Sequence, residues 1–300
     1  MDKITMLGTG HAMVTECFNS CFVYENENGK MLVDTGGGNG LLRQMRAAGI
    51  DSSEISAVFI SHRHTDHSMG LPWLFRHLGK QDDPDEQPVT LYLHEDMMNT
   101  AKEMLHALYA EDFTAALECG QLRLVEVCHG DEMEILGRKF RFLNLYSPNV
   151  PQFGFVMTME NGKRFVFHGD VPFSEENRAE FEGVEWLMHE AFMLESEPMP
   201  GPGGPGGPGR GPRPPMPPKG GGPGGPGGPG GPGGPGGKMG HSTVKGAGKI
   251  ARSLRAENLI LVHGSDNDLA NRQRKYTEEA AQAFSGNILV PNDLDVIELI

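Results

Sequence analysis

The run His62 to His67 (HRHTDH) places three histidines and a carboxylate within six residues. The apolar segment Ala57 to Ile60 lies just before it and helix-compatible residues follow, so the run should join a buried strand to a helix. On an extended backbone the first two histidines point the same way, and Asp66 and His67 then come from the first helical turn. Imidazole and carboxylate bind divalent zinc, manganese or iron. The run predicts a site for one or two metal ions, with a histidine-rich surface loop as the alternative.

Other polar residues stand at the ends of further apolar segments. Asp34 closes one such segment and precedes three glycines, either to position a ligand loop or to cap the next helix. Asp170 and His263 likewise follow apolar segments. His168 is two residues from Asp170 and shares its face, so it either approaches the same site or packs in the core.

The rest of the chain alternates short apolar segments with amphipathic ones. Strands are expected at residues 4–7, 20–24, 30–33, 50–60, 89–93, 122–127, 134–136, 140–145, 153–159, 164–167, 185–188 and 258–262. Helices are expected at 41–48, 96–108 and 268–284, with another capped by Ser242 or Thr243 and running to Leu254. Asn161-Gly162 is a strong hairpin signal, and the segments between 122 and 145 suggest an antiparallel meander. His77 and His106 are expected on helix faces or at the surface.

Composition limits the class of partner. The 300 residues carry a formal net charge of −14, which disfavours a general nucleic-acid binder or a protein that binds anionic membranes. The four cysteines form neither a C-x-x-C pair nor a disulfide framework. No signal peptide or bilayer-spanning apolar run is recognised. A cytoplasmic protein without a membrane partner is therefore expected.

Residues 198 to 237 break the pattern with repeats of Gly-Gly-Pro. Such a segment cannot bury a core, and we interpret it as a flexible insertion in a single domain spanning residues 1–300. It contains Arg210, Arg213 and Lys219, with no acidic residue between Gly201 and Gly237. It is either an inert tether or an arm that contacts a polyanion.

The run His62 to His67 resembles the His-x-His-x-Asp-His signature of the metallo-β-lactamase superfamily, and Gly169-Asp170 resembles its Gly-Asp motif. Within this superfamily the chain is most similar to ribonuclease Z, the tRNA 3′-processing endonuclease. The supporting segments outside the metal motifs are Leu7 to Gly10, Gly70 to Pro72, His189-Glu190-Ala191 and His241-Ser242-Thr243. The resemblance covers the chain outside the Gly/Pro insertion. It implies an α/β fold of the αββα sandwich type, made of two similar halves.

The resemblance also implies a set of metal ligands. One ion would take Asp66, His67, Asp170 and His263, and the other would take His62, His64 and the shared Asp170. Asp34 would orient the metal-ligand loop without binding metal. Two zinc ions, with manganese or iron as alternatives, can hold a phosphodiester and activate water.

Three catalytic roles follow from the same resemblance. Asp66 would orient the attacking water or serve as its general base. Glu190 and His241 would together assist departure of the leaving group. The implied substrate is a tRNA precursor cut at its 3′ trailer, and a homodimer is compatible with the family.

Three features depart from the ribonuclease Z pattern. The further metal-binding histidine expected before Pro151 is absent, and Tyr146 or Pro148 takes its place. The site of His62, His64 and Asp170 is therefore weak, empty, or completed by water or His168. The tRNA-binding arm has only Val150 to Gly169 available. The basic loop expected near Phe18-Asn19 lacks its positive residues.

Two other functions stay open beside the ribonuclease. One is a hydrolase of the same fold that acts on a small phosphodiester or ester, favoured by the acidic composition and the missing arm. The other is a non-catalytic relic that binds metal without turnover. Metal content separates them, because two ions per chain favour the enzymes and one tightly held ion favours the relic or mononuclear chemistry.

Overall fold

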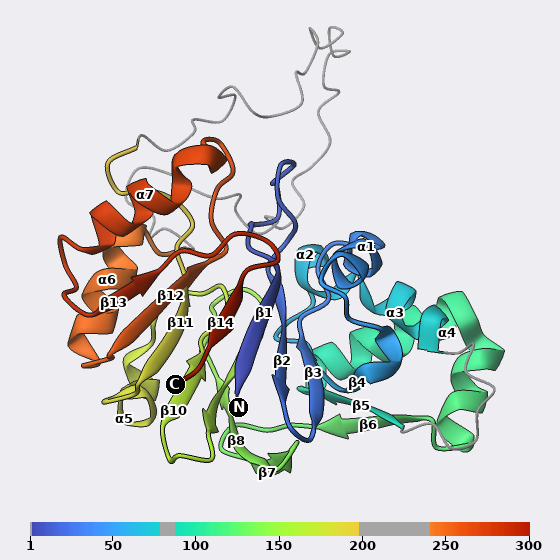
Figure 1. Cartoon of the computed structure of the whole chain (residues 1–300). Helices are drawn as coiled ribbons and strands as arrows, with labels where there is room; N and C mark the ends of the chain where they lie inside the picture. The colour runs from blue at the N-terminus through green and yellow to red at the C-terminus, as the bar shows by residue number, and fades with distance from the viewer. Residues whose placement is uncertain (1, 79–87, 198–240) are drawn as a thin grey trace, which may run out of the picture.

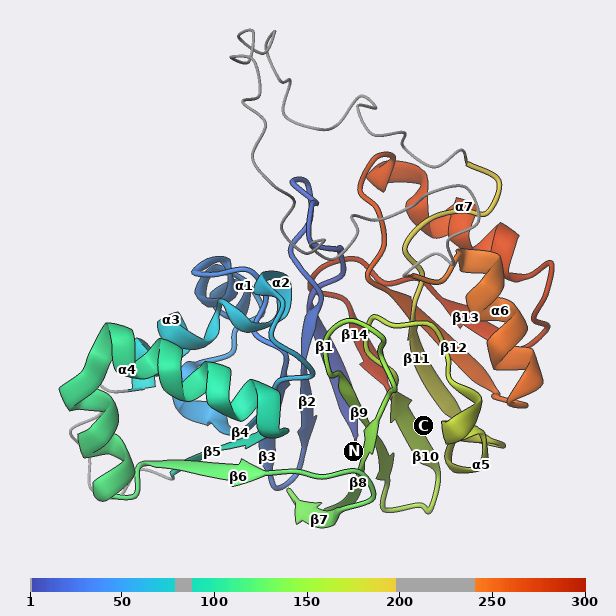
Figure 2. The same cartoon turned by 180° about the vertical axis from the view of Figure 1, so that it is seen from behind.

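The computed structural model describes residues 2–78, 88–197 and 241–300. The Gly/Pro segment at 198–237 and the acidic loop predicted at 81–86 lie outside the described residues. Two β-sheets pack face to face, and helices cover the outer face of each sheet (Figures 1 and 2). This is the predicted αββα sandwich.

The first sheet holds seven strands in the described chain, in the order β14-β1-β2-β3-β4-β5-β6. Strands β3 to β6 run parallel, and the other neighbours pair antiparallel. The bounds are β1 Lys3–Gly8, β2 Cys21–Asn26, β3 Gly29–Val33, β4 Ile55–Phe59, β5 Val89–Leu93, β6 Leu122–Glu126 and β14 Val296–Glu298.

The second sheet repeats this arrangement in the order β13-β12-β11-β10-β9-β8-β7. Strands β10 to β13 run parallel and the remaining neighbours are antiparallel. The bounds are β7 Glu132–Ile135, β8 Arg138–Asn144, β9 Phe153–Thr158, β10 Arg164–Phe167, β11 Trp186–Glu190, β12 Asn258–Val262 and β13 Asn287–Leu289. Each half thus has four parallel strands whose carboxyl ends meet at one edge.

Alternation along the strands builds three apolar layers. In β4, Ala57 and Phe59 enter the core between the sheets, while Val58 and Ile60 enter the core beneath the helices of the first half. Both faces of this strand are buried, which explains its uninterrupted apolar sequence. The α-helices are α1 Gly40–Ala47, α2 Thr65–Ser68, α3 Leu71–Leu78 and α4 Glu95–Glu118 in the first half, and α5 Arg178–Phe181, α6 Val244–Ser253 and α7 Leu269–Ala280 in the second.

Two sequence expectations were wrong in detail. The predicted meander does not include residues 122–127, because β6 pairs parallel with β5 in the first sheet, whereas β7, β8 and β9 pair antiparallel in the second. Helix α4 is also longer than predicted, since it continues past Leu108 to Glu118 through a kink at Tyr109, where φ is −144° and ψ is 37°. A crossover helix of this length lets β6 return parallel to β5.

Short 3₁₀ turns complete the described elements. One, Ser52–Glu54, occupies the start of the segment predicted as a strand from Ile50, and its cap Asp51 accepts a hydrogen bond from the Ser53 N–H. The other is Glu175–Asn177. The Asn161-Gly162 hairpin is present, because β9 pairs antiparallel with β10.

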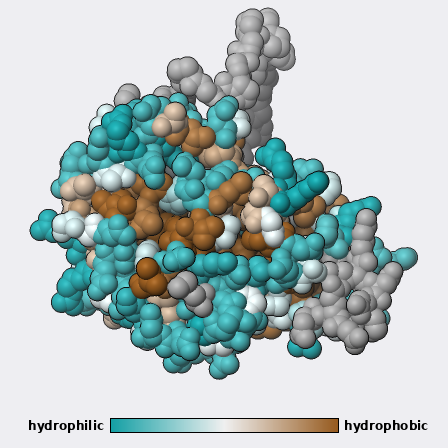
Figure 3. Space-filling model, viewed as in Figure 1, coloured by the Kyte–Doolittle hydropathy of each residue, from teal (hydrophilic) through white to brown (hydrophobic). Residues whose placement is uncertain are grey.

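The surface of the C-terminal side carries apolar residues. Figure 3 shows them across the middle of the face seen in Figure 1, and the exposed large apolar residues of the C-terminal segment include Leu294, Val296 and Ile300. No helix in the described chain combines the length and apolarity needed to cross a membrane. The homodimer expected from the family resemblance stays a prediction, because exposed apolar residues alone do not establish an interface.

Candidate metal centre

The carboxyl ends of the parallel strands bring the candidate ligands together. His62 follows β4 directly, and His64 occupies the N-cap position of α2 with extended φ and ψ of −59° and 148°. The single turn of α2 then supplies Asp66 and His67, both buried. Asp170 follows β10, and His263 follows β12. The predicted strand–turn–helix geometry of the run therefore exists as expected.

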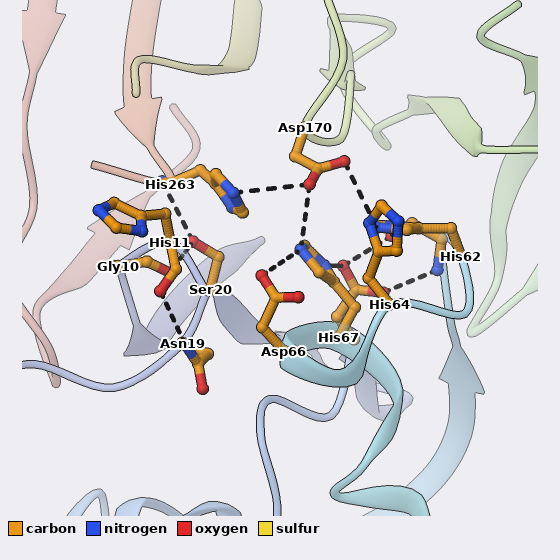
Figure 4. A network of polar contacts seen from close by, with 12 residues as sticks. Gly10, His11, Asn19, Ser20, His62, His64, Asp66, His67, Asp170 and His263 are labelled. Carbon is orange, nitrogen blue, oxygen red and sulfur yellow. Dashed lines mark hydrogen bonds and ion pairs between the residues drawn. The ribbon is translucent and has the colours of Figure 1, made fainter. Parts of the chain in front are cut away.

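These side chains form two groups that can hold a metal ion. Within each group the ligand atoms lie within 4.8 Å of one another. The groups are Asp66, His67, Asp170 and His263, and His62, His64 and Asp170. Figure 4 shows Asp170 between them, reaching His67 and His263 on one side and His62 on the other. The contacts from Asp170 to the Nε2 atoms of His62, His67 and His263 each measure 3.5 Å.

The chemistry of the donors fits divalent cations. His67 Nδ1 contacts Asp34 Oδ2 at 2.7 Å, which leaves Nε2 with its lone pair directed at Asp66 and Asp170. That Nε2 atom and Asp170 Oδ1 are both buried without a hydrogen-bond partner in the described chain. A carboxylate behind a histidine fixes the tautomer that a metal needs. The cluster is therefore able to bind metal ions.

The pKa shifts of two histidines and of Asp170 agree with this fit. At His67 burial lowers the pKa, but the charges of Asp34 and Asp170 outweigh it and raise the pKa well above its usual value. Burial lowers the pKa of His62 and His263, that of His263 to about 3, against the opposing charge of Asp170. Burial alone would raise the pKa of Asp170, but His62 and His67 hold it well below its usual range. Neutral imidazoles and an ionised carboxylate are the forms that coordinate divalent cations.

Asp34 anchors the metal run from the first sheet. Its Oδ1 accepts a 2.7 Å hydrogen bond from the Ser61 N–H, and its Oδ2 accepts one of 2.8 Å from Ser61 Oγ and contacts His67 Nδ1. The side chain is 1% exposed, and φ at Asp34 is 57°. It touches the run and belongs to neither metal-binding group; its role in orienting the ligand loop stays a prediction.

The two groups differ in completeness. The first has four buried donors, whereas the second has three and includes the exposed His64. His62 Nε2 and His64 Nδ1 lie 2.8 Å apart, so both nitrogens face the same point. Tyr146, one of the residues that replaces the missing histidine, packs its ring 5.9 Å from that of His129 and is 46% exposed.

His168 does not complete the weaker group. Gly169 adopts a left-handed φ of 71°, and Asp170 beyond it reaches both metal-binding groups. His168 instead keeps the face of Val166, in the layer that contains Phe181. Its ring stacks on His189 at 4.5 Å and lies 5.7 Å from Phe181. Of the two alternatives, the packed histidine is the one observed.

Glu190 and His241 form the second predicted constellation. Glu190 is fully buried at the end of β11, and its Oε2 lies 2.7 Å from His241 Nδ1 while Oε1 accepts a 2.8 Å hydrogen bond from the Ser242 N–H. The His241 ring stacks 5.6 Å from that of His263. The pair therefore lies beside the candidate metal centre. His241 is partly exposed, and Glu190 is buried on the interior side of His241.

Sequence reasoning missed one neighbour of this site. The ring of His11 lies 6.3 Å from that of His263 and 4.6 Å from Phe192. The Gly8-Thr9-Gly10 turn was the available signal, because glycine permits close approach of two backbones. The partner of that turn, Gly264, lies at the other end of the chain, so local pattern could not reveal it.

Comparison with known proteins places the chain among metal-dependent hydrolases. Residues 2–199 match the family described as anti-Pycsar protein Apyc1. Ribonuclease Z from Halorubrum lacusprofundi is 26% identical over 343 aligned positions, which cover 99% of this chain and 97% of that protein. Ribonuclease Z from Natronomonas pharaonis is 24% identical, with 99% and 97% covered.

Solved structures agree on the fold. The metallo-β-lactamase fold protein YhfI from Bacillus subtilis superposes with a TM-score of 0.70 at 17% identity, covering 99% of this chain and 100% of YhfI. Human tRNase Z, short form, superposes with a TM-score of 0.64 at 19% identity, covering 99% of both chains. The metallo-β-lactamase fold is thereby confirmed.

Proposed function

Because this chain belongs to the anti-Pycsar protein Apyc1 family and is a hydrolytic enzyme of the metallo-β-lactamase fold, we propose that it cleaves a small phosphodiester. The buried His/Asp cluster is the proposed reaction centre, with zinc as the proposed metal. The description of the family, anti-Pycsar protein, suggests that the biological role of this hydrolysis is to act against Pycsar.

The observation that carries the choice of a small substrate is the β9–β10 hairpin. These strands are joined by residues 159–163, in which Met159 N–H donates to Lys163 O at 2.9 Å and closes the turn. The resemblance to ribonuclease Z requires a tRNA-binding arm in this stretch, and a closed turn leaves none. A substrate held mainly at the cluster itself fits such a surface better than a folded RNA does.

The proposed roles follow the contacts of each residue. His62, His64, Asp66, His67, Asp170 and His263 would hold two cations. When bound, such ions supply charge neutralisation for the phosphodiester and acidify a bound water. Asp66, a buried member of its group, orients the attacking water and accepts its proton. His241, as the imidazolium, gives a proton to the oxygen that leaves and becomes neutral, and Glu190 stabilises the imidazolium before this transfer.

The test is hydrolysis of bis(p-nitrophenyl) phosphate, a linear dinucleotide, a cyclic mononucleotide and a tRNA precursor with a 3′ trailer. Each assay uses protein loaded with zinc or manganese, with Asp66→Ala as control. Turnover of small diesters that Asp66→Ala loses is the expected result. Failure of every small diester would refute the proposal.

A tRNA precursor is the second candidate. The two ribonuclease Z relatives align over 99% of this chain. The resemblance to that family also implies a role for Glu190 and His241, which lie 2.7 Å apart. Specific cutting at the trailer junction, absent in Asp66→Ala, would favour this substrate and make RNA the partner.

The Glu190–His241 pair predicts a pH effect. Burial disfavours the imidazolium, but the hydrogen bond and charge of Glu190, with the charge of Asp170, outweigh it and raise the pKa of His241. A proton donor is lost as the pH rises through its pKa, so kcat should fall on the alkaline side. Glu190→Gln removes a cause that raises this pKa, and the fall should then begin at lower pH.

The pH profile of kcat for wild type and Glu190→Gln checks this expectation. His241→Ala is the control, since it should lack the alkaline fall altogether. An unchanged alkaline limb in Glu190→Gln would contradict the assignment of His241 as the proton donor.

A further inference from the structure

The backbone of His11 is clamped to the loop that carries His263. The His11 N–H donates to Gly264 O at 3.2 Å, and Gly264 N–H donates to Thr9 O at 3.1 Å. Asn19 Nδ2 donates to His11 O at 2.8 Å from the other side (Figure 4). These bonds fix the position of His11 relative to the candidate metal ligand.

The side chain of His11 is held in one tautomer. Its Nδ1 accepts a 3.1 Å hydrogen bond from the Met13 N–H, so the proton of the neutral ring lies on Nε2. Burial lowers the pKa of His11 against the opposing charges of Asp266 and Asp66, which favours the neutral ring. Nε2 has no hydrogen-bond partner within the described chain.

The rings of His11, Phe192 and His241 lie beside His263, a member of the metal cluster, and form with it a quartet of rings. His11 and His241 flank His263, with ring centroids 6.3 and 5.6 Å from it. Phe192 packs against both, at 4.6 Å from His11 and 4.8 Å from His241. His263 is buried, whereas His11, Phe192 and His241 are partly exposed. His11, Phe192 and His241 are therefore the members of the quartet that a substrate entering from solvent can contact.

One cation of the described chain lies within the metal run itself. Arg63, the cation within the metal run, is already paired with Asp96 at 3.0 Å. A fixed N–H donor is the other common way to bind a phosphoryl oxygen. His11 presents such a donor next to the cluster.

We propose that His11 is a substrate-binding residue whose Nε2–H donates a hydrogen bond to a phosphoryl oxygen of the diester. This inference rests on the proposed function and adds a contact to it. The contact supplements the cluster and is made in both the bound substrate and the transition state. Its loss should therefore raise KM more than it lowers kcat.

The test compares His11→Phe and His11→Gln with wild type on bis(p-nitrophenyl) phosphate. Phenylalanine keeps a ring against Phe192 but has no donor, and we expect KM to rise about tenfold. Glutamine restores an N–H donor and should recover most of that loss. Metal content and melting temperature of both variants should match those of wild type.

Either of two results would overturn the inference. A wild-type KM in His11→Phe would show that the donor is unused. Equal losses in both variants, accompanied by less metal or a lower melting temperature, would assign His11 a purely structural role. Wild-type turnover separates these failures from that of the proposed function, since an inactive wild type would refute the diesterase itself.

Discussion

Replacing Asp170 with alanine is expected to release metal from both groups and to lower kcat/KM by about a thousandfold or more. Asp170 is the one residue shared by the two candidate groups in the described chain, and it lies 3.5 Å from three histidines. Without the Asp170 carboxylate, the two groups share no negatively charged ligand that could hold both metal ions. The loss should exceed that of any single histidine.

Metal analysis by mass spectrometry and initial rates measure this effect. Asp66→Ala belongs to one group only, so it should lose hydrolysis and the ion of that group while keeping part of the other. Asp131→Ala is the matched control, because this carboxylate lies outside both groups and accepts a 2.8 Å hydrogen bond from the Cys128 N–H. Two ions retained by Asp170→Ala, or wild-type turnover by Asp66→Ala, would contradict the assignment.

Asp34→Ala should weaken both folding and metal binding. The substitution leaves the Ser61 N–H, Ser61 Oγ and His67 Nδ1 without their buried acceptor. Removing one partner of such a buried polar pair costs about 3–5 kcal/mol in free energy of unfolding. Loss of the carboxylate behind a ligating histidine lowers metal affinity by about 10- to 100-fold.

Two further variants separate the causes. Asp34→Asn tolerates the left-handed φ of 57° and keeps the side-chain shape, so it should recover stability but only part of the metal affinity. Asp51→Ala removes a carboxylate that caps a surface turn and should cost about 1 kcal/mol. Denaturant unfolding and metal titration give both quantities; an Asp34→Ala variant as stable as Asp51→Ala would refute the anchoring role.

Residues at strand ends could be predicted because their signals are local. The run His62 to His67 combines an apolar strand, a tight turn and a helix start within one window, and the structure has that geometry. Asp170 and His263 also follow apolar segments, so the meeting of parallel strand ends was expected once the fold was inferred. The ligand roles themselves remain predictions.

Long-range pairing explains what the sequence could not reveal. His11 reaches the site only because Gly10 pairs with Gly264, a contact between the two ends of the chain. His168 and Asp170 do not share a face as the alternation predicts, because Gly169 between them has a left-handed φ and Asp170 turns to the metal-binding groups. The pairing of β6 with β5 and the extension of α4 past Leu108 are settled by tertiary packing, which local helix propensity does not encode.

The repeated strand pattern has a consequence for the site. Asp34 follows β3 as Asp170 follows β10, and His94 follows β5 as His263 follows β12. His94 is buried, stacks on Phe153 at 4.8 Å, and its Nε2 atom has no partner in the described chain. At corresponding strand ends, one histidine thus belongs to a group that can hold a metal ion, whereas the other packs in the interior against an aromatic ring.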